Sequence, residues 1–194
     1  MTQTPAKHVT AAPAWSVRLL SEFAAADARA SALAKPLTAA QLNWTPQPGV
    51  WSVGQCLEHL CVASEYYLPA IARSLVNGRG GVVQEITPGW FGRWFIRNYI
   101  EPSSKTRRAR APGKIKPGAV VDGAILDRFI ANNARTREII DRAKAFDVNR
   151  IRFTNPFVPL IHFTVGTGFE ILSKHQDRHL LQAERIRASV EFPA

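Results

Sequence analysis

Two histidines four residues apart, His175 and His179, are the residues whose types and spacing most clearly indicate chemistry. They lie in the stretch FEILSKHQDRHLLQAERI, residues 169–186, whose pattern of apolar residues is helical. Side chains one helical turn apart face the same way, so the two imidazoles could bind one metal ion. They could equally take part in acid–base chemistry or form a polar surface patch.

The two histidines occupy positions that normally hold the apolar residues of a helix seam. At steps of three and four this seam reads Val165, Gly168, Leu172, His175, His179, Gln182 and Ile186. Side chains at such positions face the interior of a helix bundle. A buried polar group without a partner costs roughly 1–3 kcal/mol, so the imidazoles need partners there. A metal ion is one such partner.

A metal site needs a third ligand, and the chain has three other histidines. His8 lies in a start that we expect to be frayed. His162 precedes His175 by 13 residues, which is roughly 20 Å along a helix at 1.5 Å per residue. His59 lies in another predicted helix and can meet the pair if the two helices are neighbours. Three histidines would leave further positions on the ion open to water or substrate, as in catalytic sites.

Four helical patterns would position these side chains. They cover about 14–33, 52–77, 121–146 and 164–189. In the second pattern Ser52 is followed three residues later by Gln55, as in a capping box. The chain has 194 residues, of which 46% are hydrophobic and 21% charged, which suits one folded domain. We therefore expect an all-α fold, a four-helix bundle of residues 14–190 after a flexible N-terminus of residues 1–13.

A long connection, residues 78–119, separates the second and third helices. It contains WFGRWFIRNYIEPSS, which we expect to form a short amphipathic helix, followed by an exposed loop. Residues 93–116 hold eight basic residues and one acidic residue, so they carry +7 of the net charge of +10. The basic run 105–116 suits phosphate binding or attraction of an anionic substrate. No base-reading module is recognisable, which argues against nucleic acid as a partner.

Three other polar side chains are candidates for lining a pocket. Gln182 lies one turn beyond His179, Asn133 interrupts the apolar seam of the third helix, and Tyr66 lies two turns beyond His59. Each has a plainer alternative, an interhelical hydrogen bond for the two amides and a core position for the tyrosine. The segment that joins the third and fourth helices, residues 147–163, is expected to be irregular.

Three residues next to the histidines or to the helix start have expected structural roles. Glu58 and Asp177 each adjoin a histidine in sequence but point away from the histidine face, so we expect a solvated surface, with a hydrogen bond to a ligand as the alternative. Trp51 is expected to pack at the end of the bundle.

The two cysteines, Cys56 and Cys61, are five residues apart in one predicted helix, so their side chains point well apart. A disulfide between them is not expected, and two free thiols fit a reducing cytoplasm. The sequence shows neither the apolar run of a signal peptide nor one of about 18 residues that could cross a membrane.

The sequence resembles the DinB/YfiT-like superfamily of metalloenzymes in two places, PGVWSVGQCLEHL and HQDRHLLQAERI. The positions that match are Trp51, Ser52, His59, His175, His179 and Gln182. The similarity spans about residues 14–188, although the 78–119 connection is not diagnostic. The resemblance implies an up-down-down-up four-helix bundle, one divalent metal ion held by the three histidines, and a homodimer.

The resemblance also implies an activity. Relatives include thiol-dependent transferases and isomerases that use low-molecular-weight thiols, and hydrolase activity has been proposed. Our leading hypothesis is a metal-dependent thiol transferase or hydrolase acting on a small molecule, with metal-bound water or thiolate as the nucleophile. The ion could be Zn, Ni, Fe or Mn, with a low-molecular-weight thiol as cosubstrate. The alternatives are a bundle that binds metal or an anion without catalysis and, third, nucleic-acid binding through the basic connection.

Overall fold

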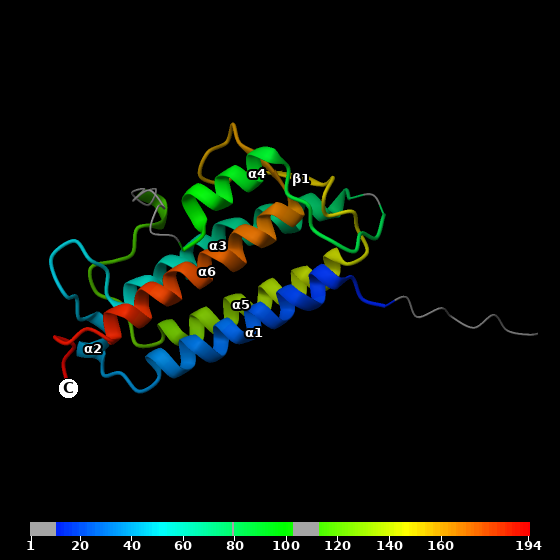
Figure 1. The fold of residues 1–194 in the computed structure, drawn as a ribbon. Helices are drawn as coiled ribbons and strands as arrows, with labels where there is room; N and C mark the ends of the chain where they lie inside the picture. Colours follow the sequence, from blue (N-terminus) through cyan, green and yellow to red (C-terminus); the bar gives the residue numbers. More distant parts are fainter. Residues whose placement is uncertain (1–10, 79, 103–112) are drawn as a thin grey trace, which may run out of the picture.

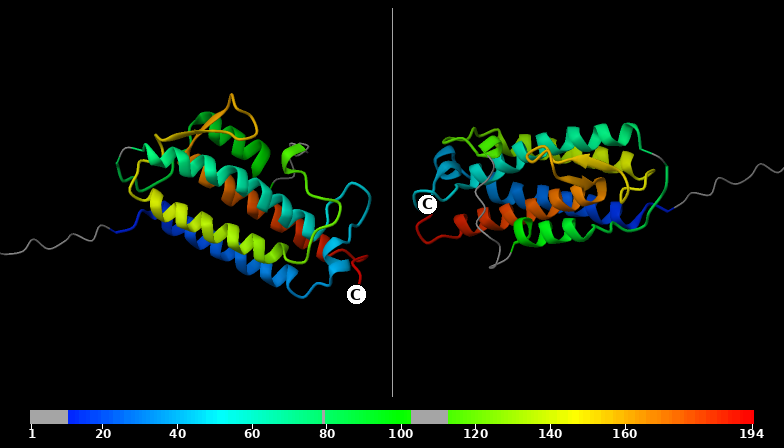
Figure 2. Two further views of the ribbon diagram at one scale, coloured as in Figure 1. Left: turned by 180° about the vertical axis from the view of Figure 1, so that it is seen from behind. Right: turned by 90° about the horizontal axis from the view of Figure 1, so that it is seen from above.

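The computed structural model describes residues 11–78, 80–102 and 113–194, and it is mostly helical, in line with the expected all-α class. Its four long helices lie side by side (Figures 1 and 2). They are α1 (Ala14–Ala34), α3 (Val53–Val76), α5 (Ile125–Ala143) and α6 (Val165–Arg187). The predicted boundaries agree within a few residues, and α5 differs most because residues 121–124 form its lead-in rather than its first turn. In the described part of the chain, no helix has the length and apolar character needed to cross a membrane.

Ion pairs show the relative direction of α1 and α6, which pack against each other. Arg18 pairs with Glu170 near the start of both helices, and Arg29 pairs with Glu184 at 2.9 Å near the end of both. The two helices therefore run in the same direction.

The helices α3 and α5 also run in the same direction. Gly54, at the start of α3, lies against Val121 just before α5. One to two turns further along both helices, the Cys61 carbonyl of α3 accepts a hydrogen bond from Asn132 of α5. Each member of this pair also packs against a helix of the other pair, α3 against α6 and α5 against α1.

The start of α3 is fixed by the capping box expected from the sequence. The Ser52 hydroxyl accepts from the Gln55 backbone N–H at 3.1 Å, and Gln55 Oε1 accepts from the Ser52 N–H at 3.0 Å. Because this box defines where the first turn begins, it also fixes which way His59, seven residues later, points from the helix. The helix continues through Pro69 to Val76.

The core consists of two apolar clusters separated by a layer of polar side chains, all of them buried except the half-buried Asp27. One cluster is formed around Trp15, Ile71 and Phe169, and the other around Leu57, Phe129 and Leu180. At the level between them, all four long helices contribute polar residues. The layer consists of Asp27 of α1, Ser64 of α3, Asn132, Asn133 and Thr136 of α5, and Ser173 and Gln176 of α6.

Two short segments of the long connection have regular structure. Helix α4 (Trp90–Phe95) continues directly into a π-helical turn, η1 (Ile96–Ile100), and a 3-10 turn, η2 (Gly113–Ile115), lies shortly before α5. The predicted amphipathic helix is thus present, and it packs outside the long helices (Figure 1). Gly92 lies against Thr167 of α6. Residues 103–112, which include most of the basic run, lie outside the described residues, as do residues 1–10 of the expected flexible N-terminus.

Two further elements were not predicted. A short helix, α2 (Ala39–Asn43), begins with a capping box between Thr38 and Gln41. The segment expected to be irregular contains an antiparallel hairpin of β1 (Arg152–Thr154) and β2 (His162–Thr164), in which the buried Phe153 and Phe163 lie opposite each other.

The turn of this hairpin is closed by a side chain. Asn155 Oδ1 accepts hydrogen bonds from the backbone N–H groups of Phe157 at 2.8 Å and Val158 at 3.1 Å. Three-residue strands give too short an alternation for a sequence pattern to indicate them.

Candidate metal centre

Three histidine side chains from two helices come together beside the polar layer. His59 of α3 and His175 and His179 of α6 each offer a ring nitrogen, and these nitrogens all lie within 4.8 Å of one another. The Nε2 atoms of His59 and His175 are 3.1 Å apart. His59 and His179 are buried and His175 is half-buried. This meeting was expected from the sequence on the condition that the two helices are neighbours, which they are.

The antiparallel packing of α3 against α6 brings these residues to the same depth. Near the end of α3, Ile71 lies against Gly168 in the first turn of α6, and near the start of α3, His59 faces His175. A Cβ atom at position 168 would lie 2.7 Å from the Phe153 ring and 3.1 Å from Ile71. Glycine therefore lets α6 lie close to both Phe153 and Ile71 at that end of α3. The two contacts together set how far α6 lies along α3.

Hydrogen bonds to the Nδ1 atoms fix the orientation of two of the rings. Nδ1 of His59 lies 2.7 Å from the carbonyl oxygen of Ile115 in η2, and Nδ1 of His179 lies 3.0 Å from Oε1 of Gln182. Both partners are acceptors, so both Nδ1 atoms carry the proton and donate it. The Nε2 atoms of His59 and His179 therefore keep their lone pairs, which is the tautomer that a metal ligand requires.

The surroundings keep all three imidazoles neutral. Burial lowers the pKa of His59 and lowers that of His175 well below the usual value, and it lowers the pKa of His179 to about 3. The positive charge of Arg178 and the mutual repulsion of charged imidazoles act in the same direction. Only neutral imidazole binds a metal, so the ligands need not lose protons at neutral pH.

The donor set fits a divalent metal ion. Two nitrogens bound at about 2.0–2.1 Å and separated by about 90–110° at the metal lie roughly 2.9–3.4 Å apart. The 3.1 Å between Nε2 of His59 and Nε2 of His175 falls in this interval. Imidazole ligands suit Zn²⁺, Ni²⁺ and Fe²⁺, whereas Mn²⁺ prefers oxygen ligands. Three ligands leave positions for water or substrate.

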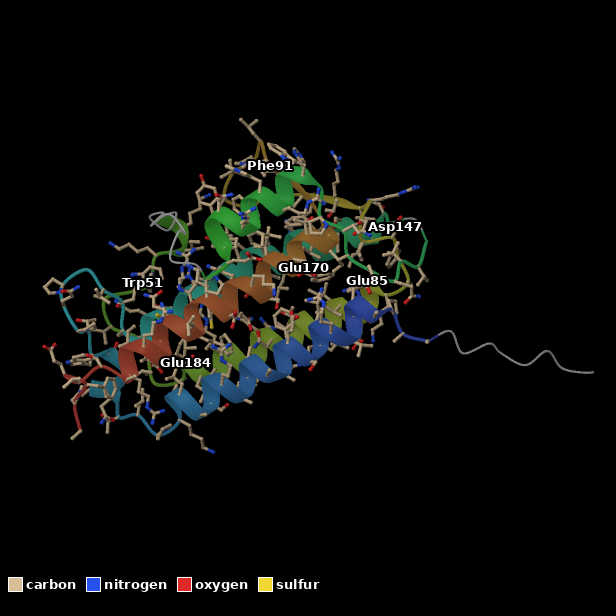
Figure 3. The ribbon with its side chains drawn as sticks, in the orientation of Figure 1. Trp51, Glu85, Phe91, Asp147, Glu170 and Glu184 are labelled. Carbon is tan, nitrogen blue, oxygen red and sulfur yellow. The ribbon has the colours of Figure 1, made fainter. Side chains whose placement is uncertain are left out.

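Trp51 makes a contact that the sequence analysis missed. It packs at the end of the helices as expected (Figure 3). Its ring also lies 4.7 Å from the His59 ring and 5.6 Å from the His179 ring, measured between centroids. The indole thus covers one side of the site. Its position directly before the Ser52 cap was the available signal, since the residue preceding a helix often folds back over the first turns.

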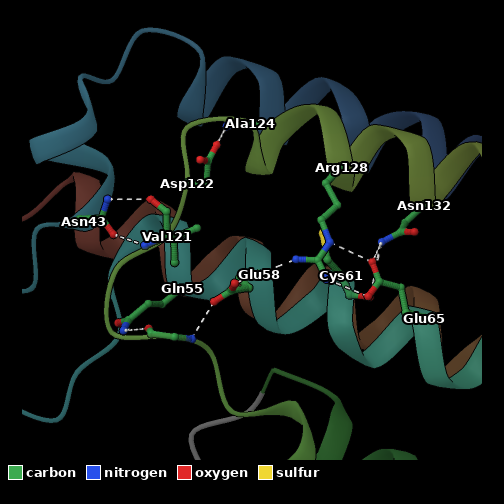
Figure 4. A network of polar contacts seen from close by, with 11 residues as sticks. Asn43, Gln55, Glu58, Cys61, Glu65, Val121, Asp122, Ala124, Arg128 and Asn132 are labelled. Atoms are coloured by element: carbon green, nitrogen blue, oxygen red, sulfur yellow. Dashed lines mark hydrogen bonds and ion pairs between the residues drawn. The ribbon is translucent and has the colours of Figure 1, made fainter.

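Glu58 holds the long connection in place rather than facing solvent or a ligand. Its Oε2 accepts from the backbone N–H of Gly118 at 2.7 Å, and Gln55 Nε2 donates to the Gly118 carbonyl at 2.7 Å (Figure 4). A similar pair of bonds joins Asn43 to the backbone of Val121. These contacts bring the chain back to α3 just after Ile115, whose carbonyl binds His59.

The other candidate residues lie in different contacts. Gln182 contacts His179, as described above. Asn133 donates to Asp27 at 2.6 Å and exchanges hydrogen bonds with Gln176 in the polar layer. Tyr66 is exposed and its ring meets Phe157 next to the hairpin. Of these three candidates, Gln182 is the one with a direct contact to a histidine. Asp177 pairs with Arg29 at 2.7 Å on the surface, as a solvated residue would.

Neither cysteine is a nucleophile or ligand in this arrangement. Cys56 and Cys61 are free thiols, as expected, and both are buried. Burial raises the pKa of Cys56 far above its usual value and raises that of Cys61 to about 12, so both remain protonated at neutral pH.

Comparison with known proteins gives one match. The family model of the DinB superfamily matches residues 22–183, a range that contains all three histidines. The chain has no significant match among curated proteins or among solved structures.

Proposed function

The chain belongs to the DinB superfamily, and from this membership and its three converging histidines we propose that it is a metal-dependent enzyme acting on a small molecule. His59, His175 and His179 bind one divalent ion, and of the four expected from the sequence, Zn²⁺, Ni²⁺ and Fe²⁺ suit three imidazole ligands better than Mn²⁺ does. The observation that carries the proposal is the convergence of three neutral imidazoles, with two Nε2 atoms 3.1 Å apart and two Nδ1 atoms already hydrogen-bonded.

We infer that the four long helices form the up-down-down-up bundle of this superfamily. The shared direction of α1 and α6, the shared direction of α3 and α5, and the antiparallel contact of α3 with α6 support this arrangement. A homodimer remains a proposal that rests on the family, and light scattering after gel filtration would test it.

The chemistry proposed for the site needs few protein groups. When bound, a divalent ion supplies Lewis acidity that lowers the pKa of a water or thiol at an open position. The chain contributes orientation and neutrality: Ile115 and Gln182 hold two rings, and Trp51 covers them on one side. No hydrogen bond or ion pair among the described residues joins a carboxylate to the three histidines, so the ion keeps its full positive charge.

We propose thiol transfer or hydrolysis as the reaction class, with a low-molecular-weight thiol as cosubstrate in the first case. Both of the chain's own thiols are buried and protonated. A thiol nucleophile therefore has to come from outside the chain. Loss of an external thiol from the assay should abolish a transferase reaction and leave a hydrolase reaction unchanged.

Metal analysis of the purified protein tests the site. After incubation with Zn²⁺ or Ni²⁺ and desalting, we expect about one equivalent in the wild type and far less in His59→Ala. His162→Ala, which removes an exposed histidine of β2, is the matched control and should keep its metal. Equal metal content in His59→Ala and the wild type would show that the three-histidine site is wrong.

An activity screen then separates an enzyme from a metal-binding protein. Metal-loaded protein would be assayed for transfer of a thiol to an electrophile and for hydrolysis of esters and amides. Turnover that is lost in His59→Ala supports the enzyme, whereas metal binding without any turnover across the screen favours the non-catalytic alternative.

A further inference from the structure

Arg178 of α6 places a positive charge next to the three histidines. It lies one residue before His179 and three after His175, and it is half-buried. Because residues three apart on a helix are neighbours on its surface, the Arg178 side chain leaves α6 beside that of His175. The charge of Arg178 also contributes to the lowered pKa of His59, His175 and His179.

The guanidinium is held on one side and free on the other. Its Nη1 donates to the backbone carbonyl of Tyr99 in η1, which orients the group. Within residues 11–78, 80–102 and 113–194, Nε and Nη2 have no hydrogen-bond acceptor, and no carboxylate forms an ion pair with Arg178. Neighbouring N–H groups on Nε and Nη2 form the planar fork that binds two oxygens of a carboxylate or phosphate at once.

The charges around the site also favour an anionic ligand. The carboxylates nearest in sequence are engaged elsewhere, Asp177 with Arg29 and Glu58 with the Gly118 N–H. Lys114 and Lys116, both exposed, flank Ile115 on the side of His59.

A divalent ion beside Arg178 would therefore add its charge of +2 to the +1 of the guanidinium without a contacting carboxylate among the described residues. Positive charges that are partly withdrawn from water are costly unless they are paired. An anionic ligand would balance these charges.

We propose that Arg178 binds an anionic group of the substrate, a carboxylate or a phosphate, and so holds the substrate while another part of it reaches the three histidines. This inference rests on the proposed function, and it assigns that function a substrate class: small anionic molecules. Arg178 acts by contact with the substrate, and the Tyr99 carbonyl positions its guanidinium.

Matched thiols test the proposal by calorimetry on the Zn²⁺-loaded protein. The probes are 3-mercaptopropionate and 3-mercapto-1-propanol, which differ in the carboxylate. We expect Arg178→Gln to bind the carboxylate about 10- to 100-fold more weakly, the usual effect of losing hydrogen bonds to a charged group, and to bind the alcohol as the wild type does. Arg178→Lys keeps the charge but loses the planar fork, so its affinity for 3-mercaptopropionate should lie between those of the wild type and Arg178→Gln.

A control variant, Arg185→Gln, and a second anion, inorganic phosphate, complete this test. Arg185→Gln removes an exposed arginine two turns further along α6 and should bind both thiols as the wild type does. A titration with inorganic phosphate shows whether phosphate is the preferred anion. The proposal is overturned if Arg178→Gln binds both anions as tightly as the wild type.

A metal-free measurement separates failure of this proposal from failure of the metal site. The Nε–H resonance of Arg178, identified as the signal missing from Arg178→Gln, should shift and saturate when 3-mercaptopropionate or phosphate is added to metal-free protein, and should not shift with the alcohol. If the protein takes up no metal but shows this shift, the metal site is wrong and the anion site stands. If it takes up metal but neither the shift nor the affinity depends on Arg178, the anion site is wrong.

Discussion

The carbonyl oxygen of Ile115 lies 2.7 Å from Nδ1 of His59, so a residue of the long connection determines the tautomer of a histidine on α3. The connection is held there by Gln55 and Glu58, which bind both backbone groups of Gly118. A histidine ligand is thus oriented by a segment 56 residues away in sequence.

Releasing this segment should weaken metal binding without unfolding the protein. We expect Glu58→Ala, which frees the Gly118 N–H and leaves the Ser52–Gln55 capping box intact, to lower Zn²⁺ affinity up to about tenfold, because groups that orient a ligand typically contribute 10- to 100-fold. Competition with a chromophoric chelator measures the affinity. Asp177→Ala is the control, since Asp177 also adjoins a histidine but pairs with Arg29. If Glu58→Ala and the control bind Zn²⁺ equally, the bond from Glu58 to the connection does not orient His59.

Gln182 should act on the metal through His179. Gln182→Leu removes the acceptor of the Nδ1 proton and is expected to lower Zn²⁺ affinity about 10- to 100-fold. Gln182→Glu keeps an acceptor and should bind Zn²⁺ at least as tightly as the wild type. An equal loss in both variants would mean that packing, and not the hydrogen bond, is what Gln182 contributes.

The metal-free protein should lose stability as the pH falls below about 6.5, the usual pKa of histidine in an unfolded chain. The folded pKa of each of the three histidines is lower than that, about 3 for His179, so at acidic pH the unfolded state binds more protons than the folded state. Each such histidine can then reduce the free energy of unfolding by up to about 1.4 kcal/mol per pH unit.

Urea unfolding at pH 7.5 and pH 5.5 in the presence of a chelator measures this loss. His179→Gln should show a smaller loss than the wild type, because one of the groups that take up a proton on unfolding is gone. His162→Gln, at an exposed position, should behave as the wild type does. A wild-type stability that does not change between the two pH values contradicts the prediction.

The hydrogen bonds between Asn133 and Gln176 should matter as a pair. Gln176→Leu leaves the buried Asn133 amide with an unpaired oxygen, and we expect a loss of about 1–3 kcal/mol in the free energy of unfolding. In Asn133→Leu combined with Gln176→Leu, Asp27 still pairs with Arg137, so the loss should be smaller than the sum of the two single changes. Additive losses would show that the two amides are not coupled.

The sequence predicted the helices that are determined by residues close together in the chain. Helix periodicity located α1, α3, α5 and α6, and the Ser52–Gln55 spacing located the start of α3. His59 could be grouped with His175 and His179 because a metal site needs a third ligand and the helix of His59 could lie next to theirs. The resemblance to the DinB superfamily, now supported by the match over residues 22–183, made the same grouping.

What the sequence did not predict depends on contacts between distant segments. The contact between Ile115 and His59 depends on the course of the connection between α3 and α5. Helix periodicity does not predict the course of a segment outside the helices. Asn133 was correctly placed on the inner side of its helix, but whether it meets a pocket or Gln176 depends on how three helices are rotated against one another. The hairpin was missed because each of its strands has three residues.

The buried polar layer also has a consequence for alignment. If α6 slid along its neighbours by one helical turn, about 5.4 Å, Gln176 would leave Asn133 and the amides of both would face apolar side chains. Apolar contacts alone tolerate such a slide, because one leucine can replace another, whereas a single pair of matched amides does not. The layer therefore helps to fix the position of α6 along its neighbouring helices. It thereby helps to bring His175 and His179 to the depth of His59.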